Sequence, residues 1–194
     1  MDKNVIDLSN LRLPDISPRL ILIGLMVILG LVMVGGTLYQ VQPEEVAVVT
    51  RFGAYVRTEE SGLQMKIPFL ESVLKVPVER QLKHEFGFRT ADPAIRTRYS
   101  EGRFGDESVM LTGDLNVAVV EWIVQYRVSD PYLFLFKVRN REETFRDMTE
   151  AVMREVVGDR TVTEVLTVGR QEIESTVQLR LQELCNQYEI GIAV

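Results

Sequence analysis

The residue types that most often carry out covalent or metal chemistry are scarce in this sequence. Its 194 residues include one cysteine, Cys185, and one histidine, His84. One cysteine cannot form an internal disulfide or a paired-cysteine metal site, and one histidine cannot complete a two-histidine metal centre. A cysteine–histidine nucleophile would need these two single residues to meet in the fold. We therefore expect no catalytic residue, no metal ligand and no cofactor.

Paired carboxylates do not indicate a site either. The pairs Glu44-Glu45 and Glu59-Glu60 are adjacent residues, which point to opposite faces of a strand, so we expect them in solvent. The pair Asp106-Glu107 lies beside Gly105 in an expected loop, where a cation would need more carboxylates than the segment offers. No phosphate-binding loop or nucleophile-elbow motif is present. A Ser/Lys dyad stays open as an alternative, because no motif selects a pair.

Composition and charge favour a folded protein that works by binding. The chain is 46% hydrophobic, which is too apolar for a disordered protein. It carries 22 basic and 28 acidic residues, a formal charge of -6, and this argues against a general nucleic-acid-binding surface.

Residues 20–39, LILIGLMVILGLVMVGGTLY, form an uncharged apolar run after a lead of residues 1–19. A helix rises 1.5 Å per residue, so such a run spans about 30 Å, the hydrocarbon thickness of a bilayer. A cleaved signal peptide usually has a shorter apolar core, roughly 7–15 residues, followed by a small-residue cleavage site. The run therefore predicts a transmembrane helix.

Basic residues predict the orientation of this helix. Lys3, Arg12 and Arg19 precede the run, and Arg51 and Arg57 are the nearest basic residues after it. The excess before the run favours a cytoplasmic N-terminus, with Arg19 at one membrane edge. Tyr39, at the other edge, suits the aromatic belt of the far interface.

In the part of the chain after the apolar run, the first elements that the sequence predicts are strands. VAVVTRFGAYV (46–56) is typical of a strand with a turn or bulge at Gly53, and a second short strand is expected at 72–78. From Ala118 to Val128 every second residue is apolar, which predicts a long strand with one buried face. A turn at Gly113-Asp114 predicts that residues 108–112 pair back as a hairpin.

Helices are expected later in the chain. Apolar residues at 145, 148, 152 and 156 predict one helix, which Gly158-Asp159 ends. Thr161 and Glu164 resemble a capping box that opens a short helix, and a third apolar stripe runs from Ile173 to Tyr188. The sequence therefore predicts an α+β fold, a largely antiparallel sheet with helices on one face. We expect two parts, residues 40–78 next to the membrane and residues 79–194.

Two segments are candidates for contact with a membrane or a partner. In GLQMKIPFL (62–70), Ile67, Phe69 and Leu70 could rest on lipid with Lys66 near headgroups; the alternative is a core turn at Pro68. Residues 80–103 hold six basic and three acidic residues and are expected to form a loop. This loop could meet an acidic partner or anionic headgroups, or it could be a solvated loop. Its candidate contact residues are Arg89, Arg96, Arg98 and Arg103.

The segment EEVAVVTRFGAYVRTEESGLQMKIPFLESVLKVPV, after the apolar run, resembles the start of a stomatin/prohibitin/flotillin/HflK-C (SPFH, band-7) domain. The pattern G-L-x-x-x-I-P-F with a later D-P is common to the superfamily. Three stretches are more specific and resemble one bacterial branch: EFGFRT (85–90), ESVMLTGDLNVAVVEWIVQYRVSDP (107–131) and YEIGIAV (188–194). The resemblance covers the chain from about Leu20 onward.

The resemblance implies a function as well as a fold. It implies a single-pass protein of the bacterial inner membrane with its main domain in the periplasm and no enzymatic activity. The implied partners are an HflC-like paralogue, which would alternate with this chain in a high-order ring or cage, and an FtsH-like AAA protease inside that cage. Family members continue beyond the position of Val194 into a coiled coil. The alternative function is a stomatin-like organiser of lipid microdomains or of a membrane channel.

Overall fold

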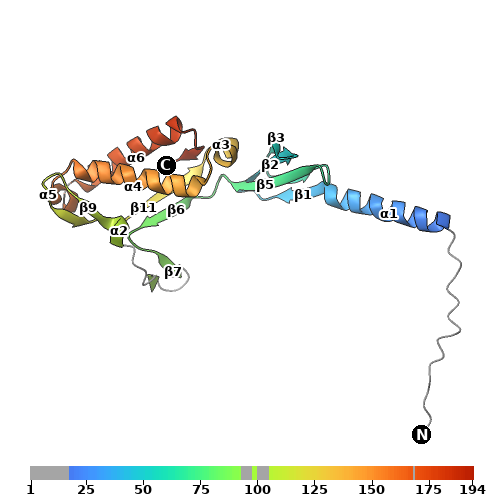
Figure 1. Ribbon diagram of the computed structural model, residues 1–194, viewed down its shortest axis with the longest axis horizontal. Coiled ribbons are helices and arrows are strands. Elements are labelled where there is room, and N and C mark those ends of the chain that lie inside the picture. The colour runs from blue at the N-terminus through green and yellow to red at the C-terminus, as the bar shows by residue number, and fades with distance from the viewer. Residues whose placement is uncertain (1–17, 93–97, 100–104, 168) are drawn as a thin grey trace, which may run out of the picture.

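The computed structural model describes residues 18–92, 98–99, 105–167 and 169–194. The molecule is elongated (Figure 1). Helix α1 (Pro18–Thr37) lies at one end, the strands β1 to β5 follow it, and the helices α4 to α6 with the hairpin β9–β10 lie at the far end.

Helix α1 is followed directly by strand β1 (Leu38–Val41), which pairs antiparallel with β4 (Gly62–Met65). Leu38 and Tyr39 therefore belong to a strand, and the prediction that the helix extends to residue 39 is wrong. Their backbone is held by the pairs Leu38–Met65 and Tyr39–Gln64. Within the described residues no helix combines the length and apolarity that a membrane span requires.

The first three-stranded sheet has the order β3-β2-β5 and is antiparallel throughout. Its strands are β2 (Glu45–Arg51), β3 (Ala54–Glu59) and β5 (Glu71–Pro77). The β-branched centre of β2 favours a strand, and Val48 and Val49 are fully buried. The break expected at Gly53 is confirmed as a hairpin turn, in which Phe52 and Gly53 both have positive φ.

A second three-stranded sheet, with the order β12-β11-β6, belongs to the larger part of the molecule. Its strands are β6 (Leu82–Phe86), β11 (Trp122–Val128) and β12 (Ile192–Ala193). The predicted alternation in β11 is confirmed, because Trp122, Val124, Tyr126 and Val128 are all buried.

The prediction of a loop at residues 80–103 is wrong for residues 82–86, which form strand β6. Phe86 is fully buried and stacks on Trp122 with ring centroids 4.6 Å apart. The ion pair between Lys83 and Glu85, 2.6 Å, lies on the outer face of the same strand. These charges conceal the strand alternation in the sequence. The chain then forms the short strands β7 (Thr90–Asp92) and β8 (Arg98–Tyr99).

The long strand expected around residues 118–128 is interrupted. A short helix α2 (Gly105–Ser108) leads into the hairpin of β9 (Val109–Leu111) and β10 (Val117–Val119), which confirms the predicted hairpin. The chain leaves the strand conformation at Val120 and Glu121 before β11 begins. The Val120 N–H donates to the Ser108 carbonyl, 2.8 Å, so this break belongs to the hairpin rather than to β11.

Four helices complete the fold: α3 (Pro131–Phe136), α4 (Arg141–Gly158), α5 (Val162–Leu166) and α6 (Arg170–Gln187). The predicted capping box is confirmed, since the Thr161 hydroxyl accepts from the Glu164 N–H and the Glu164 carboxylate accepts from the Thr161 N–H. The predicted end of the preceding helix at Gly158 is also confirmed.

Helices α4 and α6 lie along one face of the second sheet, so the α+β architecture is confirmed (Figure 1). Phe145 and Val152 of α4 pack with Leu181 of α6 and with the buried face of β11. The stripe of α6 continues to Cys185, which is 2% exposed, whereas Tyr188 is exposed.

Aromatic side chains join the two sheets. Tyr55 of β3 contacts Tyr132 of α3 edge-on at 4.7 Å between centroids, and Phe136 lies 6.4 Å from Tyr55. On the chain crossing between the sheets, the N–H groups of Val78 and Glu79 both donate to the Glu44 carbonyl.

Two glycines with nearly equal φ allow a stability test. Gly87 has φ +83, and a Cβ there would lie 2.7 Å from the Ser108 Cβ; Gly53 has φ +86, with no atom within 4 Å of such a Cβ. Gly53→Ala is expected to cost about 1–2 kcal/mol, the cost of a left-handed backbone. Gly87→Ala adds the clash and should cost clearly more, as measured by chemical denaturation. Equal unfolding midpoints for the two variants would contradict this packing.

Candidate functional site

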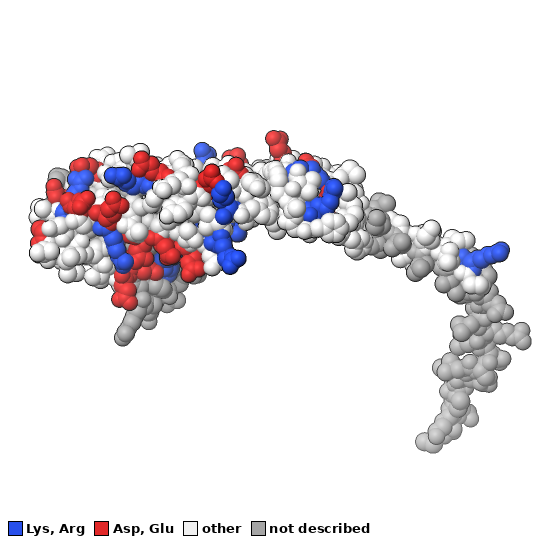
Figure 2. Space-filling model, turned by 45° about the horizontal axis from the view of Figure 1, so that its top comes forward, with Lys and Arg blue, Asp and Glu red and all other residues white. Residues whose placement is uncertain are grey.

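Exposed apolar side chains gather where α1 passes into β1, and we call them the apolar rim. Phe52 and Phe69 are 81% and 82% exposed. The rim consists of Leu38, Phe52, Leu63, Met65, Ile67, Phe69 and Leu70. Charged side chains of both signs are interspersed over the domain beyond the rim, whereas α1 is largely without them (Figure 2). So many exposed apolar side chains together are typical of an interaction surface.

Backbone contacts fix the rim against the end of α1. The Lys66 N–H donates to the carbonyl of Thr37, the last residue of the helix, at 2.7 Å. The Phe52 N–H donates to the Leu70 carbonyl at 3.3 Å, which brings the β2–β3 turn beside the loop of residues 66–70. The apolar side chains are therefore presented from a defined backbone.

A buried carboxylate holds this loop. The Glu71 side chain is fully buried and accepts from Arg51 at 2.8 Å and from Arg57 at 3.1 Å. It also accepts the Ile67 N–H at 3.0 Å. Because a buried charge without partners is costly, these donors fix both Glu71 and the loop before it.

Arg57 extends this cluster to β4 and β3. Its guanidinium donates to the Met65 carbonyl at 2.8 Å and to Glu59 at 2.6 Å. The hydrogen bonds from Arg57, from the Ile67 N–H and from Arg51 lower the pKa of Glu71 to about 2. The carboxylate is therefore ionised at neutral pH.

The structure brings together three of the predicted membrane-contact residues and separates the others. Ile67, Phe69 and Leu70 are all exposed and lie in the rim. Arg19 is exposed at the beginning of α1, at the opposite end of that helix. Tyr39 is half-buried in β1, and its hydroxyl is shielded from solvent. Whether any of them contacts lipid stays a prediction.

Four members of the rim were not found from the sequence. Leu63 and Met65 lie in β4, which pairs with β1 and so places Leu38 beside Met65. Phe52 belongs to a hairpin turn, and a large aromatic residue at a turn is the signal that could have found it.

Of the four predicted partner-contact arginines, only Arg89 has a side chain among the described residues, so their joint contact with a partner stays a prediction. Arg89 donates to Glu107 at 2.8 Å and to the carbonyls of Glu85 and Phe88. Its guanidinium thus has internal partners. The backbone of Arg98 lies in β8 opposite Asp92, and Arg96 and Arg103 lie outside the described residues.

The stretch EFGFRT (85–90) forms a tightly bonded corner. Glu85 accepts from the Thr90 N–H at 2.7 Å and from the Thr90 hydroxyl at 2.8 Å. Glu107 accepts from Arg89, from Arg146 at 2.7 Å and from the Gly87 N–H at 3.3 Å. The described contacts of this motif are therefore structural, and they hold β6 against α4.

Cys185 is buried and His84 is half-buried. The His84 Nε2 atom lies 2.9 Å from the Tyr126 hydroxyl, and burial together with Arg146 lowers the pKa of His84. Burial raises the pKa of Cys185 to about 11, so this thiol stays protonated at neutral pH. In the part of the chain that the structure describes, no group of three or more His, Cys, Asp or Glu side chains could hold a metal ion.

Comparison with known families identifies the class of protein. Residues 39–193 match the model of the SPFH domain / Band 7 family. This match includes both three-stranded sheets, the EFGFRT corner and every residue of the rim except Leu38. The chain belongs to this family.

Similarity to curated proteins identifies a particular branch within this family. The chain is similar to Protein HflK of Treponema pallidum, with 40% identity over 171 residues, 86% of this chain and 52% of that protein. It is 38% identical over 175 residues to Protein HflK of Borreliella burgdorferi, covering 90% of this chain and 53% of that protein. It is 33% identical over 181 residues to the Modulator of FtsH protease HflK of Escherichia coli, and the matched residues make up 93% of this chain and 38% of that protein. The resemblance to HflK proteins is thereby confirmed.

The matched residues make up most of this chain but a much smaller share of each relative. The chain spans about half the length, or less, of the curated relatives that it matches. The similarity therefore concerns the SPFH domain and its surroundings.

Replacing Glu71 tests the carboxylate that holds the rim. Its pKa, about 2, is below the ordinary 4.5, so its stabilising effect is fully present above pH 4.5 and is lost as the pH falls through 2. Glu71→Gln should lower the melting temperature at pH 7, and the difference from the unmodified protein should shrink between pH 4.5 and 2. Circular dichroism in detergent measures both. The control is Glu60→Gln, an exposed position; a difference for Glu71→Gln that does not change with pH would contradict the prediction.

Proposed function

We propose that this protein is a non-enzymatic membrane scaffold that assembles with an HflC-like paralogue and modulates an FtsH-like AAA protease. The similarity to the Modulator of FtsH protease HflK, which extends over 93% of this chain, carries the proposal. In this proposal the two paralogues alternate in a ring or cage that limits which membrane proteins reach the protease. Many weak contacts between subunits become effective because a membrane confines them.

The proposal includes attachment to the bacterial inner membrane through helix α1, which contains residues 20–37 of the apolar run. The sequence supports this attachment, because the run carries no charge over twenty residues. The N-terminus would lie in the cytoplasm and the SPFH domain in the periplasm, as the basic residues before the run favour.

The apolar rim supports a close approach of the domain to the bilayer. It lies beside the end of α1, because the Lys66 N–H donates to the Thr37 carbonyl. Helix α1 joins the domain at β1 (Figure 1), and a domain attached through this helix would meet the membrane surface there. Exposed Phe69 and Phe52 would then be buried among lipid headgroups and acyl chains, which is more favourable than their exposure to water.

The rim also favours a second candidate function. A stomatin-like organiser of lipid microdomains, or of a membrane channel, would use the same surface to select lipids and would not need the protease. The two functions differ in their protein partners, so co-purification distinguishes them.

Co-purification from native membranes tests the scaffold function. With a tag on this protein and mild detergent, mass spectrometry should recover the HflC-like paralogue and the FtsH-like protease together. An unrelated single-span membrane protein with the same tag is the control. The scaffold function is wrong if the protein runs as an isolated monomer when both partners are co-expressed.

A fluorescent label tests contact of the rim with lipid. Phe69 and Leu115 are 82% and 80% exposed, but Leu115 lies in the β9–β10 hairpin at the far end of the molecule. In a Cys185→Ser background, a label on Phe69→Cys should be quenched by brominated lipids in reconstituted vesicles, and a label on Leu115→Cys should not. Equal quenching at the two positions would count against lipid contact at the rim.

A further inference from the structure

The β9–β10 hairpin exposes apolar side chains at the end of the molecule far from α1 (Figure 1). All of them are large aliphatic residues, and we call them together the hairpin face. They are Val109 and Leu111 of β9, Leu115 at the turn, and Val117 and Val119 of β10.

The register of the hairpin makes this face continuous. Its directly opposed pairs are Val117–Leu111 and Val119–Val109. Side chains of opposed residues in an antiparallel pair lie next to each other on one side of the sheet. Met110 and Ala118, between these pairs, also lie opposite each other and are buried on the other side. The hairpin is therefore apolar on both sides, whereas an antiparallel sheet with one side in water normally carries polar residues there.

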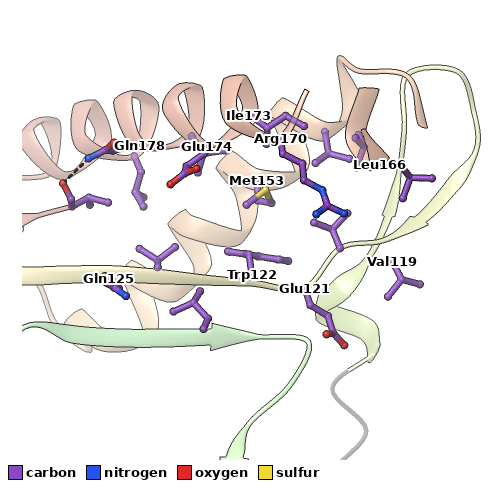
Figure 3. Close-up of a pocket in the computed structure, with 18 of the residues that line it drawn as sticks. Val119, Glu121, Trp122, Gln125, Met153, Leu166, Arg170, Ile173, Glu174 and Gln178 are labelled. Atoms are coloured by element: carbon purple, nitrogen blue, oxygen red, sulfur yellow. Dashed lines mark hydrogen bonds between the residues drawn. The ribbon is translucent and has the colours of Figure 1, made fainter. Parts of the chain in front are cut away.

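The opposite orientation of neighbouring side chains is visible where β10 passes into β11. In Figure 3, Trp122 lies beside Met153 of α4, whereas Glu121 extends away from the helices. Trp122 is buried and Glu121 is exposed. Glu121 follows Val119 by two residues, so an acidic side chain borders the hairpin face at this end.

Hydrogen bonds hold the hairpin in place. The Gly113 N–H donates to the Arg160 carbonyl at 2.8 Å, and the Val162 N–H donates to the Asp114 carboxylate at 3.1 Å. The Thr112 hydroxyl donates to the same carboxylate at 2.6 Å. These contacts fix the turn to the link between α4 and α5, so the hairpin face is presented from a defined backbone.

The size of the hairpin face indicates a weak contact. Its residues expose surface on the order of 500 Å², which is large for an apolar patch on a monomer. A standard stable complex buries roughly 800 Å² per partner, so this face alone would not hold two free molecules together. A contact of this size becomes effective between subunits that a membrane already confines.

The charge around the hairpin face has one sign. From Gly105 to Gln125 the sequence contains four acidic residues and no lysine or arginine. Three of the four, Asp106, Asp114 and Glu121, are exposed. Two such hairpins packed against each other would bring like charges together, which disfavours the hairpin of a second copy as the occupant. The charge favours an apolar surface with lysine or arginine at its border.

We propose that the hairpin face binds the neighbouring subunit of the assembly, the HflC-like paralogue, at an apolar surface bordered by basic side chains. This inference rests on the proposed function, in which neighbouring subunits are anchored side by side in one membrane. The apolar rim of a second copy is then out of reach, because the rim lies at the end next to α1 and the hairpin lies at the other end (Figure 1).

Two residues of equal exposure allow a matched test. Val117 and Leu179 of α6 are each 67% exposed. Val117→Lys would bury an unpaired charge in the contact and place it near the basic border of the partner. It should lower the amount of paralogue recovered from native membranes by about 10-fold or more, whereas Leu179→Lys should recover as much as the unmodified protein. Circular dichroism should show the same melting temperature for both variants.

Photo-crosslinking identifies the occupant without adding a charge. The amino acid p-benzoylphenylalanine replaces Leu115, which is exposed at the turn, and native membranes are irradiated. An adduct with the paralogue supports the proposal. An adduct with this chain itself or with any other molecule overturns it, and so does the absence of an adduct.

The inference and the proposed function fail in different ways. If Val117→Lys recovers as much paralogue as the unmodified protein, the hairpin face is not the contact, and the proposed function stands. If the unmodified protein recovers neither the paralogue nor the protease, the proposed function itself is wrong.

Discussion

The buried carboxylate of Glu71 is the interaction on which the end of the molecule next to α1 depends. Its oxygens collect donors from Arg51 of β2, from Arg57 of β3 and from the Ile67 backbone. Without this charge, two arginines would lie close together and the loop of residues 66–70 would lose its fixed donor. Phe69 lies within this loop, between Ile67 and Glu71, and its side chain is presented to solvent from a backbone that the carboxylate holds.

A second carboxylate organises the larger part in the same way. Glu107, just before the β9–β10 hairpin, joins Arg89 after β6 to Arg146 of α4. The Arg146 guanidinium also lies over the Phe86 ring at 4.3 Å. A motif that the sequence marks as specific to one branch of the family is therefore, in its described contacts, a device that joins strand, hairpin and helix.

Sequence periodicity predicted the elements in which the spacing of apolar and polar residues is not disturbed by charged side chains. The alternation from Trp122 to Val128 and the capping box at Thr161 depend on local spacing, which the sequence displays directly. Strand β6 was missed because Lys83 and Glu85 pair on its outer face and imitate a charged loop. Three of the seven rim residues, Ile67, Phe69 and Leu70, were predicted because they lie within four residues of one another in the sequence. Phe52 joins them through the hydrogen bond from its N–H to the Leu70 carbonyl, 18 residues later, and local spacing contains no information on such a contact.

The aromatic contact between Tyr55 and Tyr132 restrains how the two three-stranded sheets lie against each other. The chain crosses between them once near Val78, and a single crossing alone would act as a pivot. The rings of Tyr55, Tyr132 and Phe136 provide a second point of attachment. Helix α3 in turn contacts the start of β12, because the N–H of its cap residue Asp130 donates to the Gly191 carbonyl at 3.2 Å. The first sheet and the beginning of β12 are therefore joined through α3 as well as through the chain itself.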